Sequence, residues 1–284
     1  MPAPILVTGG TGTLGRLVVA GLRDAGRDLR VLSRHPHERS DGIEHVTGDL
    51  ATGEGVDAAV AGTEVIVHCA GGAKGDGDKA RHLARAASRA GVRHLINISV
   101  VGADRVPLAS AIDRAMFGYF GSKLAAERAV AGSGVPWTTL RATQFHDLIY
   151  LVVRQLARLP VVPVPAGIRF QPIDAAEVAG RLVELALGSS SGLVPDLAGP
   201  RAYDLAELAR GYLRVVGRRR LILPVRVAGQ AAKALRSGAN LSPGRAVGSR
   251  TWEEFLTERV SAPTRPQAPA GAQNLLGRLV RHPQ

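Results

Sequence analysis

Residues 5–15, Ile-Leu-Val-Thr-Gly-Gly-Thr-Gly-Thr-Leu-Gly, constrain the fold of this chain more than any other stretch. A short apolar run ends in a glycine-rich turn, and apolar residues at helical spacing follow at once, which predicts a strand, a turn and a helix. In such a turn Gly9 allows the tight bend, Gly12 lets a ligand approach the backbone, and Gly15 allows the helix to pack closely on the strand. The free N–H groups of the helix start would face phosphate. This order is the one that a dinucleotide-binding turn requires.

We therefore predict that the turn holds the pyrophosphate of a dinucleotide. The residues predicted to contact it are Thr8, Gly9, Gly10, Thr11, Gly12, Thr13, Leu14 and Gly15.

Strand-like and helix-like segments alternate after this turn. Apolar runs predict strands at 4–8, 28–33, 43–47, 65–68, 95–99 and 137–140, and helical patterns occupy 13–25, 53–61, 77–90 and 115–131. Repeated strand–helix units with short links imply a parallel sheet with helices on both faces. The predicted fold class is therefore α/β, with a doubly wound parallel sheet.

The regular alternation of strand-like and helix-like segments ends after residue 142. A helix is predicted near 144–158, a strand near 168–171, and a helix that starts at Asp174 with a capping side chain and an acid three residues later. A short strand and two amphipathic helices are predicted over 193–260. We predict a dinucleotide-binding domain over residues 1–160 and a small α/β substrate-binding region over 161–260 that shares part of the sheet. Residues 261–284 are rich in Pro, Ala and Gln and are predicted to be a flexible tail.

The positive charge is concentrated near the C-terminus. The formal net charge is +12, and residues 201–284 hold 15 Arg and Lys against 5 Asp and Glu. Such density is compatible with nucleic acid or an anionic membrane, but the only tight cluster, at 218–220, has no interleaved aromatic residues. No stretch of about 18 uncharged apolar residues occurs either. We expect a solvated basic surface, no specific nucleic-acid partner, no membrane partner, and a monomer or homodimer.

Cys69 is the only cysteine, so no intramolecular disulfide and no cysteine-rich metal site are expected. The start, Met-Pro-Ala-Pro, has no basic region ahead of an apolar one, which argues against a signal peptide. We expect a cytoplasmic protein without a bound metal.

Residues at the end of the second predicted strand bear on the choice of cofactor. An acid there would bind the ribose hydroxyls of NAD, but this chain has Ser33 and Arg34, which suit a 2′-phosphate and favour NADP. Asp49 is placed to meet the adenine edge, and a small-residue segment after the fourth strand would lie beneath the adenosine half. The further residues predicted here are Leu50, Cys69, Ala70 and Gly71; we interpret Cys69 as a small packed residue and not a nucleophile.

A second constellation is Tyr119-Phe120-Gly121-Ser122-Lys123. Tyr119 and Lys123 are four residues apart and share one face of a helix. A lysine ammonium near a phenol lowers the tyrosine pKa from about 10 toward neutrality, which makes proton transfer useful. The alternative is an incidental pair on an exposed helix.

The two constellations together resemble the short-chain dehydrogenase/reductase superfamily over about residues 4–200. The glycine pattern at 8–15 is similar to that of the extended or atypical branch, and three further segments resemble the NmrA-like group of NAD(P)-binding proteins with its Rossmann-type fold. These segments are Ile98-Ser99-Val100-Val101-Gly102, Leu140-Arg141-Ala142-Thr143-Gln144-Phe145-His146 and Gln171-Pro172-Ile173-Asp174.

The resemblance implies roles for individual residues. Tyr119 would be the general acid/base, and Lys123 would bind the nicotinamide ribose and lower the tyrosine pKa. Ser99 would polarise the substrate, or it is a cofactor contact or a plain strand-end hydrogen bonder, because Val101 is aliphatic where relatives often have a hydroxyl. Ala142 also replaces a common proline. Thr143, Gln144 and Phe145 are the predicted contacts on the nicotinamide side. His146, just past the sixth predicted strand, is a candidate for a second proton donor or a substrate contact, with a structural histidine as the alternative.

Two functions follow from these observations. The first is an NADPH-dependent oxidoreductase that acts on a small carbonyl-type molecule with a Tyr–Lys proton-transfer pair. The second is a non-catalytic NAD(P)-binding redox sensor of the NmrA-like type. Isomerase or epimerase chemistry with the same pair stays open, and the substrate is not determined by the sequence.

Overall fold

The structure is a computed structural model that describes residues 3–37, 42–72 and 74–261. The predicted flexible tail lies outside these residues from position 262 onward. The chain forms two compact units, and each is assembled from three separate segments. The first unit comprises Met1–Ser99, Ser122–Arg141 and Ala175–Pro195, and the second comprises Val100–Gly121, Ala142–Asp174 and the chain from Asp196 onward. The functional division predicted at residue 160 stays a prediction.

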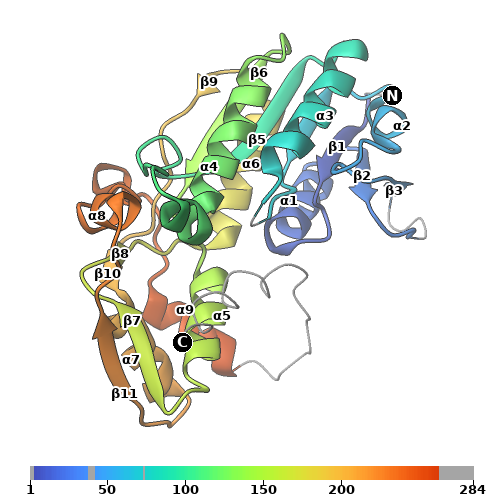
Figure 1. The fold of residues 1–284 in the computed structure, drawn as a ribbon. Coiled ribbons are helices and arrows are strands. Elements are labelled where there is room, and N and C mark those ends of the chain that lie inside the picture. The colour runs from blue at the N-terminus through green and yellow to red at the C-terminus, as the bar shows by residue number, and fades with distance from the viewer. Residues whose placement is uncertain (1–2, 38–41, 73, 262–284) are drawn as a thin grey trace. The chain divides into compact units, whose positions relative to one another are not determined.

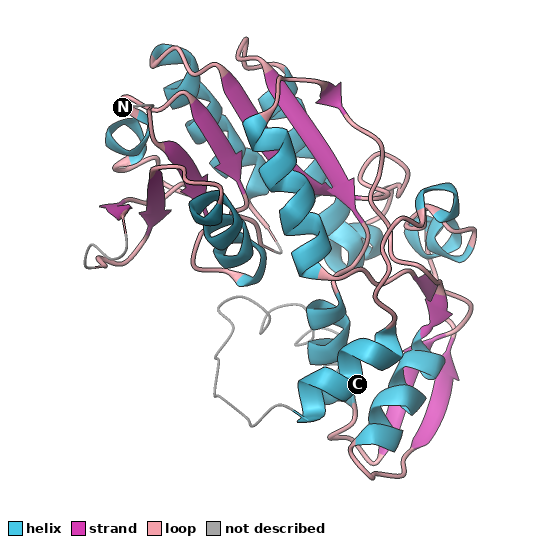
Figure 2. Ribbon diagram, turned by 180° about the vertical axis from the view of Figure 1, so that it is seen from behind, coloured by secondary structure: helices cyan, strands magenta, loops and turns pink. Residues whose placement is uncertain are grey.

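A seven-stranded parallel sheet forms the centre of the first unit (Figures 1 and 2). The strands occur in the spatial order β3-β2-β1-β4-β5-β6-β9, so the chain reverses direction across the sheet after β3. The predicted α/β fold with a doubly wound parallel sheet is confirmed. The strands are β1 (Ile5–Thr8), β2 (Leu29–Ser33), β3 (Ile43–Thr47), β4 (Val65–His68), β5 (His94–Val100), β6 (Trp137–Ala142) and β9 (Gly192–Leu193).

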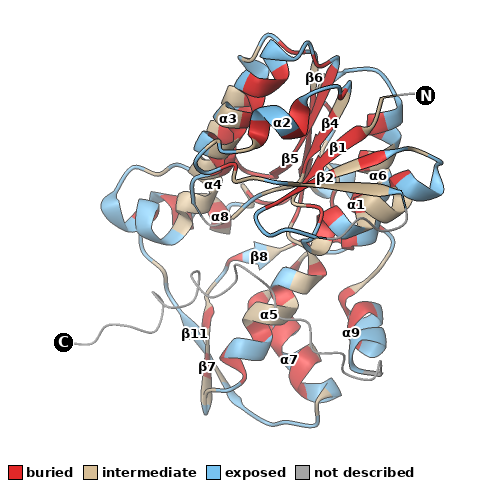
Figure 3. Cartoon of the chain, turned by 90° about the vertical axis from the view of Figure 1, so that its right-hand side faces the viewer, coloured by how far each residue is buried: buried red, intermediate tan, exposed pale blue. Residues whose placement is uncertain are grey.

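Helices cover both faces of this sheet. Figure 3 shows α1 (Thr13–Asp24) and α6 (Ala175–Leu187) on one side, and α2 (Val56–Val60) and α3 (Asp76–Arg89) on the other. The long helix α4 (Ala111–Ala131) begins in the second unit and ends in the first. Its last turns bury Ala126 and Val130 in the same apolar cluster as the inner faces of α2 and α3. This cluster fixes α3 and α4 against the sheet.

The second unit is built around helices from its later segments. Its elements are α5 (His146–Leu156), β7 (Val161–Pro165), β8 (Arg169–Phe170), β10 (Tyr203–Asp204), α7 (Leu205–Val215), β11 (Leu221–Val225), α8 (Gln230–Arg236), a 3₁₀ turn (Pro243–Arg245) and α9 (Trp252–Ser261). Trp252 is 1% exposed in the core that α5, α7 and α9 share, and its indole N–H donates to Leu208 O. Two small sheets complete the unit, β8 with β10 and β7 with β11.

Most predicted elements of the first half agree with the structure to within a few residues, whereas parts of the second half do not. The segment 161–165 is a strand that the sequence pattern left unassigned, and it pairs in parallel with β11. The helix predicted to begin after Asp174 is α6, and the Asp174 carboxylate forms an ion pair with Arg250. At α7 there is a full capping box, where Asp204 and Glu207 each accept the other's backbone N–H.

Candidate cofactor and catalytic site

The glycine turn joins β1 to α1, and its three key glycines have different surroundings. Gly9 has a φ of +69°, and a Cβ there would lie 2.7 Å from Ala70 N. A Cβ on Gly15 would lie 2.0 Å from Gly9 O, so both positions need glycine for the fold itself. At Gly12, the N-cap of α1, a Cβ would have only Gly9 O within 4 Å, at 3.3 Å, among the described residues. The turn therefore leaves more room at Gly12 than at Gly9 or Gly15, as a phosphate cradle requires.

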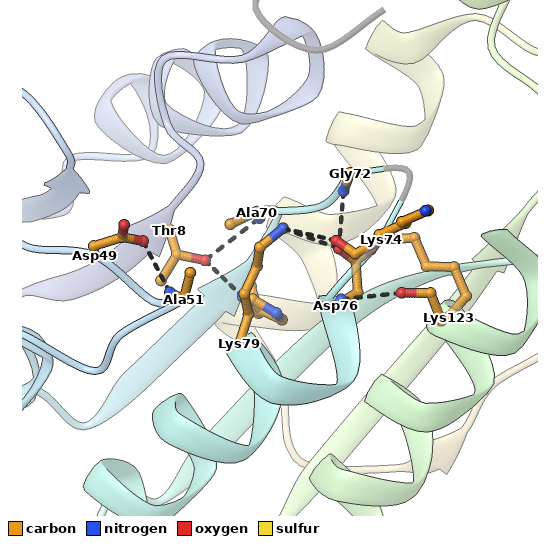
Figure 4. Close-up of polar contacts among 11 residues, drawn as sticks. Thr8, Asp49, Ala51, Ala70, Gly72, Lys74, Asp76, Lys79 and Lys123 are labelled. Atoms are coloured by element: carbon orange, nitrogen blue, oxygen red, sulfur yellow. Dashed lines mark hydrogen bonds and ion pairs between the residues drawn. The ribbon is translucent and has the colours of Figure 1, made fainter. Parts of the chain in front are cut away.

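The first residue of the turn is held by a buried histidine. Thr8 Oγ1 lies 2.7 Å from His68 Nδ1 and also accepts the Ala70 N–H at 3.4 Å (Figure 4). Burial lowers the pKa of His68 to about 4, so its imidazole is neutral at pH 7. These contacts fix the end of β4 beside the glycine turn.

The residues predicted for the adenosine half end two neighbouring strands. Ser33 Oγ accepts the His35 N–H at 3.3 Å and lies 3.1 Å from His37 Nε2, while the next residue, Arg34, is exposed. The Asp49 carboxylate accepts the Ala51 N–H at 2.8 Å and so shapes the turn after β3 (Figure 4). The surface after β2 thus carries a guanidinium and two imidazoles, while the Asp49 side chain already has a structural role.

The segment after β4 lies against Lys123. A Cβ on Gly71 would lie 2.6 Å from Lys123 Nζ, so only glycine leaves the ammonium its present position. Burial raises the pKa of the Cys69 thiol to about 12, which keeps it protonated. This protonation supports the interpretation of Cys69 as a packed small residue.

A buried carboxylate that the sequence did not reveal pairs with Lys123. Asp76, at the start of α3, is 1% exposed; its Oδ2 lies 3.1 Å from Lys123 Nζ and its Oδ1 lies 3.2 Å from Lys79 Nζ. The same carboxylate accepts the Gly72 N–H at 2.9 Å, and the Asp76 N–H donates to Ser122 Oγ at 3.0 Å (Figure 4). Asp76 therefore ties the loop after β4 to α4. Its position in the sequence gave no signal, because Lys123 lies on a different helix.

Tyr119 and Lys123 both lie on α4, one helical turn apart, so they share a helix face as predicted from their spacing. Tyr119 is half-buried and belongs to the second unit, whereas Lys123 is nearly buried in the first. Ser99, near the end of β5, is 4% exposed, and its hydroxyl has no hydrogen-bond partner within the described part of the chain. A buried hydroxyl in that state suits a ligand that would complete its hydrogen bonding.

The residues predicted for the nicotinamide side follow β6 and tie loops of the second unit together. Thr143 Oγ1 accepts the Gly199 N–H at 3.3 Å, and Gln144 Oε1 accepts the Gln171 N–H at 3.2 Å. Phe145 is the N-cap of α5 and bridges to Ile173. Their cofactor role stays a prediction, because these contacts are structural.

His146, which the sequence left as a candidate proton donor, is fully buried. Its ring centroid lies 5.1 Å from that of Phe255 and 6.0 Å from that of Trp252. His146 is therefore a core residue of the second unit, and we assign it no proton-transfer role.

Comparison with known proteins identifies the chain's relatives. Residues 9–179 match a family described as NAD(P)H-binding. The chain is 34% identical over 233 residues to the ceramide reductase of Caulobacter vibrioides, which covers 75% of this chain and 70% of that protein. It is 31% identical over 219 residues to the (4-alkanoyl-5-oxo-2,5-dihydrofuran-3-yl)methyl phosphate reductase of Streptomyces griseus, covering 75% and 74% respectively.

Solved structures share the fold at lower sequence identity. An NADPH-dependent quinone oxidoreductase from Escherichia coli, complexed with NADPH, superposes with a TM-score of 0.75 at 19% identity, over 90% of this chain and 99% of that one. The triphenylmethane reductase of a Citrobacter species, complexed with NADP(H), gives a TM-score of 0.69 at 21% identity, over 90% and 99%.

Proposed function

The chain belongs to the NAD(P)H-binding family of the atypical short-chain dehydrogenases/reductases and is an NAD(P)H-dependent oxidoreductase, and we propose that it reduces a small carbonyl compound with NADPH. The observation that carries the proposal is the ion pair of Asp76 with Lys123, which lies on the helix that also bears Tyr119. A nearly buried ammonium is costly unless it is paired. Its position beside Gly71, in a chain whose relatives are reductases, supports a catalytic use.

The residues of the turn and of the strand ends fit a dinucleotide phosphate. Gly12 has no side chain at the start of α1, where free backbone N–H groups and the positive end of the helix dipole favour anions. Arg34 would hold the 2′-phosphate, because it is exposed directly after β2 and no acid lies between residues 29 and 37. Ser33, His35 and His37 lie beside it and add donors. This set of groups is the reason to propose NADPH and not NADH.

Four side chains would take part in the reaction for which bound NADPH supplies the hydride. The Tyr119 hydroxyl would give its proton to the carbonyl oxygen of the substrate. Lys123 would bind the ribose and stabilise the phenolate that Tyr119 becomes when it gives up its proton. Asp76 would hold the Lys123 ammonium in position. The buried Ser99 hydroxyl would donate a hydrogen bond to the same carbonyl oxygen.

Replacing Tyr119 tests the catalytic assignment. Tyr119→Phe removes one hydroxyl, so NADPH affinity should be unchanged while turnover falls on the order of a hundredfold or more, as for loss of a general acid. NADPH oxidation with a panel of quinones and ketones measures turnover, and calorimetry measures binding. Tyr212→Phe, which removes a hydroxyl from the core of the second unit, is the matched control and should keep full activity. Full activity of Tyr119→Phe would end the proposal, and a parent protein that binds NADPH without consuming it would identify a sensor.

Replacing Arg34 tests the choice of cofactor. Arg34→Ala should weaken NADPH binding by about 1.5–3 kcal/mol, the range for a hydrogen bond to a charged group, and should leave NADH binding almost unchanged. Titration of both cofactors by calorimetry gives the two values. Arg85→Ala removes an exposed arginine from α3 and controls for the general loss of positive charge. Equal weakening of both cofactors would contradict the assignment of Arg34.

A further inference from the structure

The small sheet of β7 and β11 has two apolar faces. The strands pair in parallel, with Leu221 opposite Val161, Leu223 opposite Pro163 and Val225 opposite Pro165, and paired residues of a parallel sheet point to the same side. The alternate residues Val162, Val164 and Ile222 pack on the core that α5, α7 and α9 share. The opposite side, which we call the outer face, consists of Val161, Pro163, Pro165, Leu221, Leu223 and Val225.

The outer face is open to solvent along β11. Leu221 is 67% exposed, Leu223 is 50% exposed and Val225 is 42% exposed. A sheet that packs on the core with one face normally carries polar side chains on the other. Here all six residues of the other face are apolar, and a contiguous apolar surface of this kind marks an interaction site.

Arginines surround the outer face. Arg158, Arg219 and Arg220 line a surface hollow together with Pro160 and Leu221. Arg218 precedes β11 in the same run, and Arg226 follows the strand directly. Neither residues 148–173 nor residues 208–252 contain any aspartate or glutamate, and the second stretch holds ten arginines and lysines. The surface therefore has an apolar centre and a cationic rim, and neither of these two stretches adds an acid to it.

We propose that the outer face docks on the surface of an anionic lipid bilayer. Leucine and valine side chains would enter the boundary between headgroups and acyl chains, while the arginines meet the negative headgroups. Charge argues for this occupant over a second copy of the chain, since a two-fold contact would place one arginine rim against the other. A nucleic acid suits the outer face less, because bases stack on aromatic residues and the face has none.

The proposal departs from the expectation of no membrane partner. That expectation rested on the lack of a spanning segment, and none of the helices in the described ranges is long and apolar enough to cross a bilayer. Docking on a surface needs no spanning helix, because an apolar face with basic neighbours is sufficient. Three leucine and valine side chains beside several arginines predict reversible, salt-sensitive binding.

Co-sedimentation of the full chain with vesicles tests the proposal. Vesicles of phosphatidylglycerol and phosphatidylcholine should retain the protein, and vesicles of phosphatidylcholine alone should retain at least about tenfold less. Leu221→Gln/Leu223→Gln and Arg219→Gln/Arg220→Gln should each reduce binding to the anionic vesicles by about tenfold or more. Leu187→Gln and Arg85→Gln, at exposed positions of the first unit, are the matched controls and should bind as the parent does. Equal binding to both vesicle types, or no effect of either double variant, would overturn the proposal.

A label on β11 identifies the occupant directly and does not depend on loss of binding. Leu223→Cys can be labelled selectively with an environment-sensitive maleimide, because the Cys69 thiol stays protonated. The emission should be that of a solvent-exposed dye in buffer and should shift to the blue with anionic vesicles only. A blue shift in buffer that grows with protein concentration would show that a second copy of the chain, and not lipid, covers the outer face. A blue shift in buffer that does not change with protein concentration would show that the chain's own residues cover the outer face. A shift with DNA alone would show that nucleic acid is the occupant.

Discussion

Asp76 carries a buried charge that lies beside two lysines. Its carboxylate is buried, and Lys123 and Lys79 both point their ammonium groups at it. Removing one partner of a buried ion pair leaves an uncompensated charge and costs about 3–5 kcal/mol, far more than an exposed pair. The pair therefore matters for stability as well as for the position of Lys123.

We predict that Asp76→Asn lowers the free energy of unfolding by about 3 kcal/mol or more. Urea unfolding of the protein without cofactor measures this value. Asp78→Asn is the matched control on the same helix, because Asp78 forms an exposed pair with Arg81 and its loss should cost less than about 1 kcal/mol. The double variant Asp76→Asn/Lys123→Met should regain part of the loss, since both charges are then removed. A double variant as unstable as the sum of the single variants would show that the two charges are not coupled.

Individual residues differ in how far the sequence predicted them. The spacing of Tyr119 and Lys123 placed them on one helix face, because helical geometry is local. Asp76 was missed because its partner lies on another helix, and no pattern along the chain connects the two. His146 looked like a site residue from its place after β6, but burial between Trp252 and Phe255 is a property of the folded second unit.

Among the elements, the turn between β1 and α1 contains a glycine that the fold requires, Gly15, and one that we assign to ligand binding, Gly12. A Cβ at Gly15 would lie 2.0 Å from Gly9 O, whereas a Cβ at Gly12 would lie 3.3 Å from the same oxygen, which is a tight contact but not a clash. Substitutions at the two positions should therefore have different consequences, although both are glycines of one motif.

We predict that Gly12→Val keeps the fold and loses dinucleotide binding, because the branched side chain fills the space meant for the pyrophosphate. Gly15→Ala should instead destabilise the protein, since its Cβ would lie 2.0 Å from Gly9 O. Thermal unfolding followed by circular dichroism measures stability, and calorimetry with NADPH measures binding. Unchanged NADPH affinity in a folded Gly12→Val variant would show that the phosphates do not lie at this turn.

The strands β7 and β11 show why some elements escaped prediction. Three prolines lie within them, at 163, 165 and 224, and proline normally argues against a strand because it cannot donate to the ladder. A two-stranded sheet has only edge strands, so prolines fit where they would disrupt a central strand. The strands of the main sheet were predictable, because continuous apolar runs mark strands that are buried on both faces.

At the scale of the whole molecule, the order of segments along the chain and their grouping in space differ. The sequence was divided at residue 160 because the strand–helix rhythm weakens near residue 142. In the structure, Ala175–Pro195 returns to the first unit and supplies α6 and β9. Composition and periodicity describe contiguous segments, so they cannot show that a late segment completes an early sheet.

This late return has a consequence for synthesis of the protein. Until residues 175–195 emerge, β6 lacks its outer neighbour β9, and α1 lacks the helix whose Val183 packs against Gly21. At about 5–20 residues per second, a ribosome needs several seconds to pass from the end of β6 to the end of β9. During that time a nascent chain exposes an unpaired strand edge beside an uncovered sheet face, which is the surface that nascent neighbours or chaperones would meet first. Translation speed thus sets how long this protein is vulnerable to misassembly.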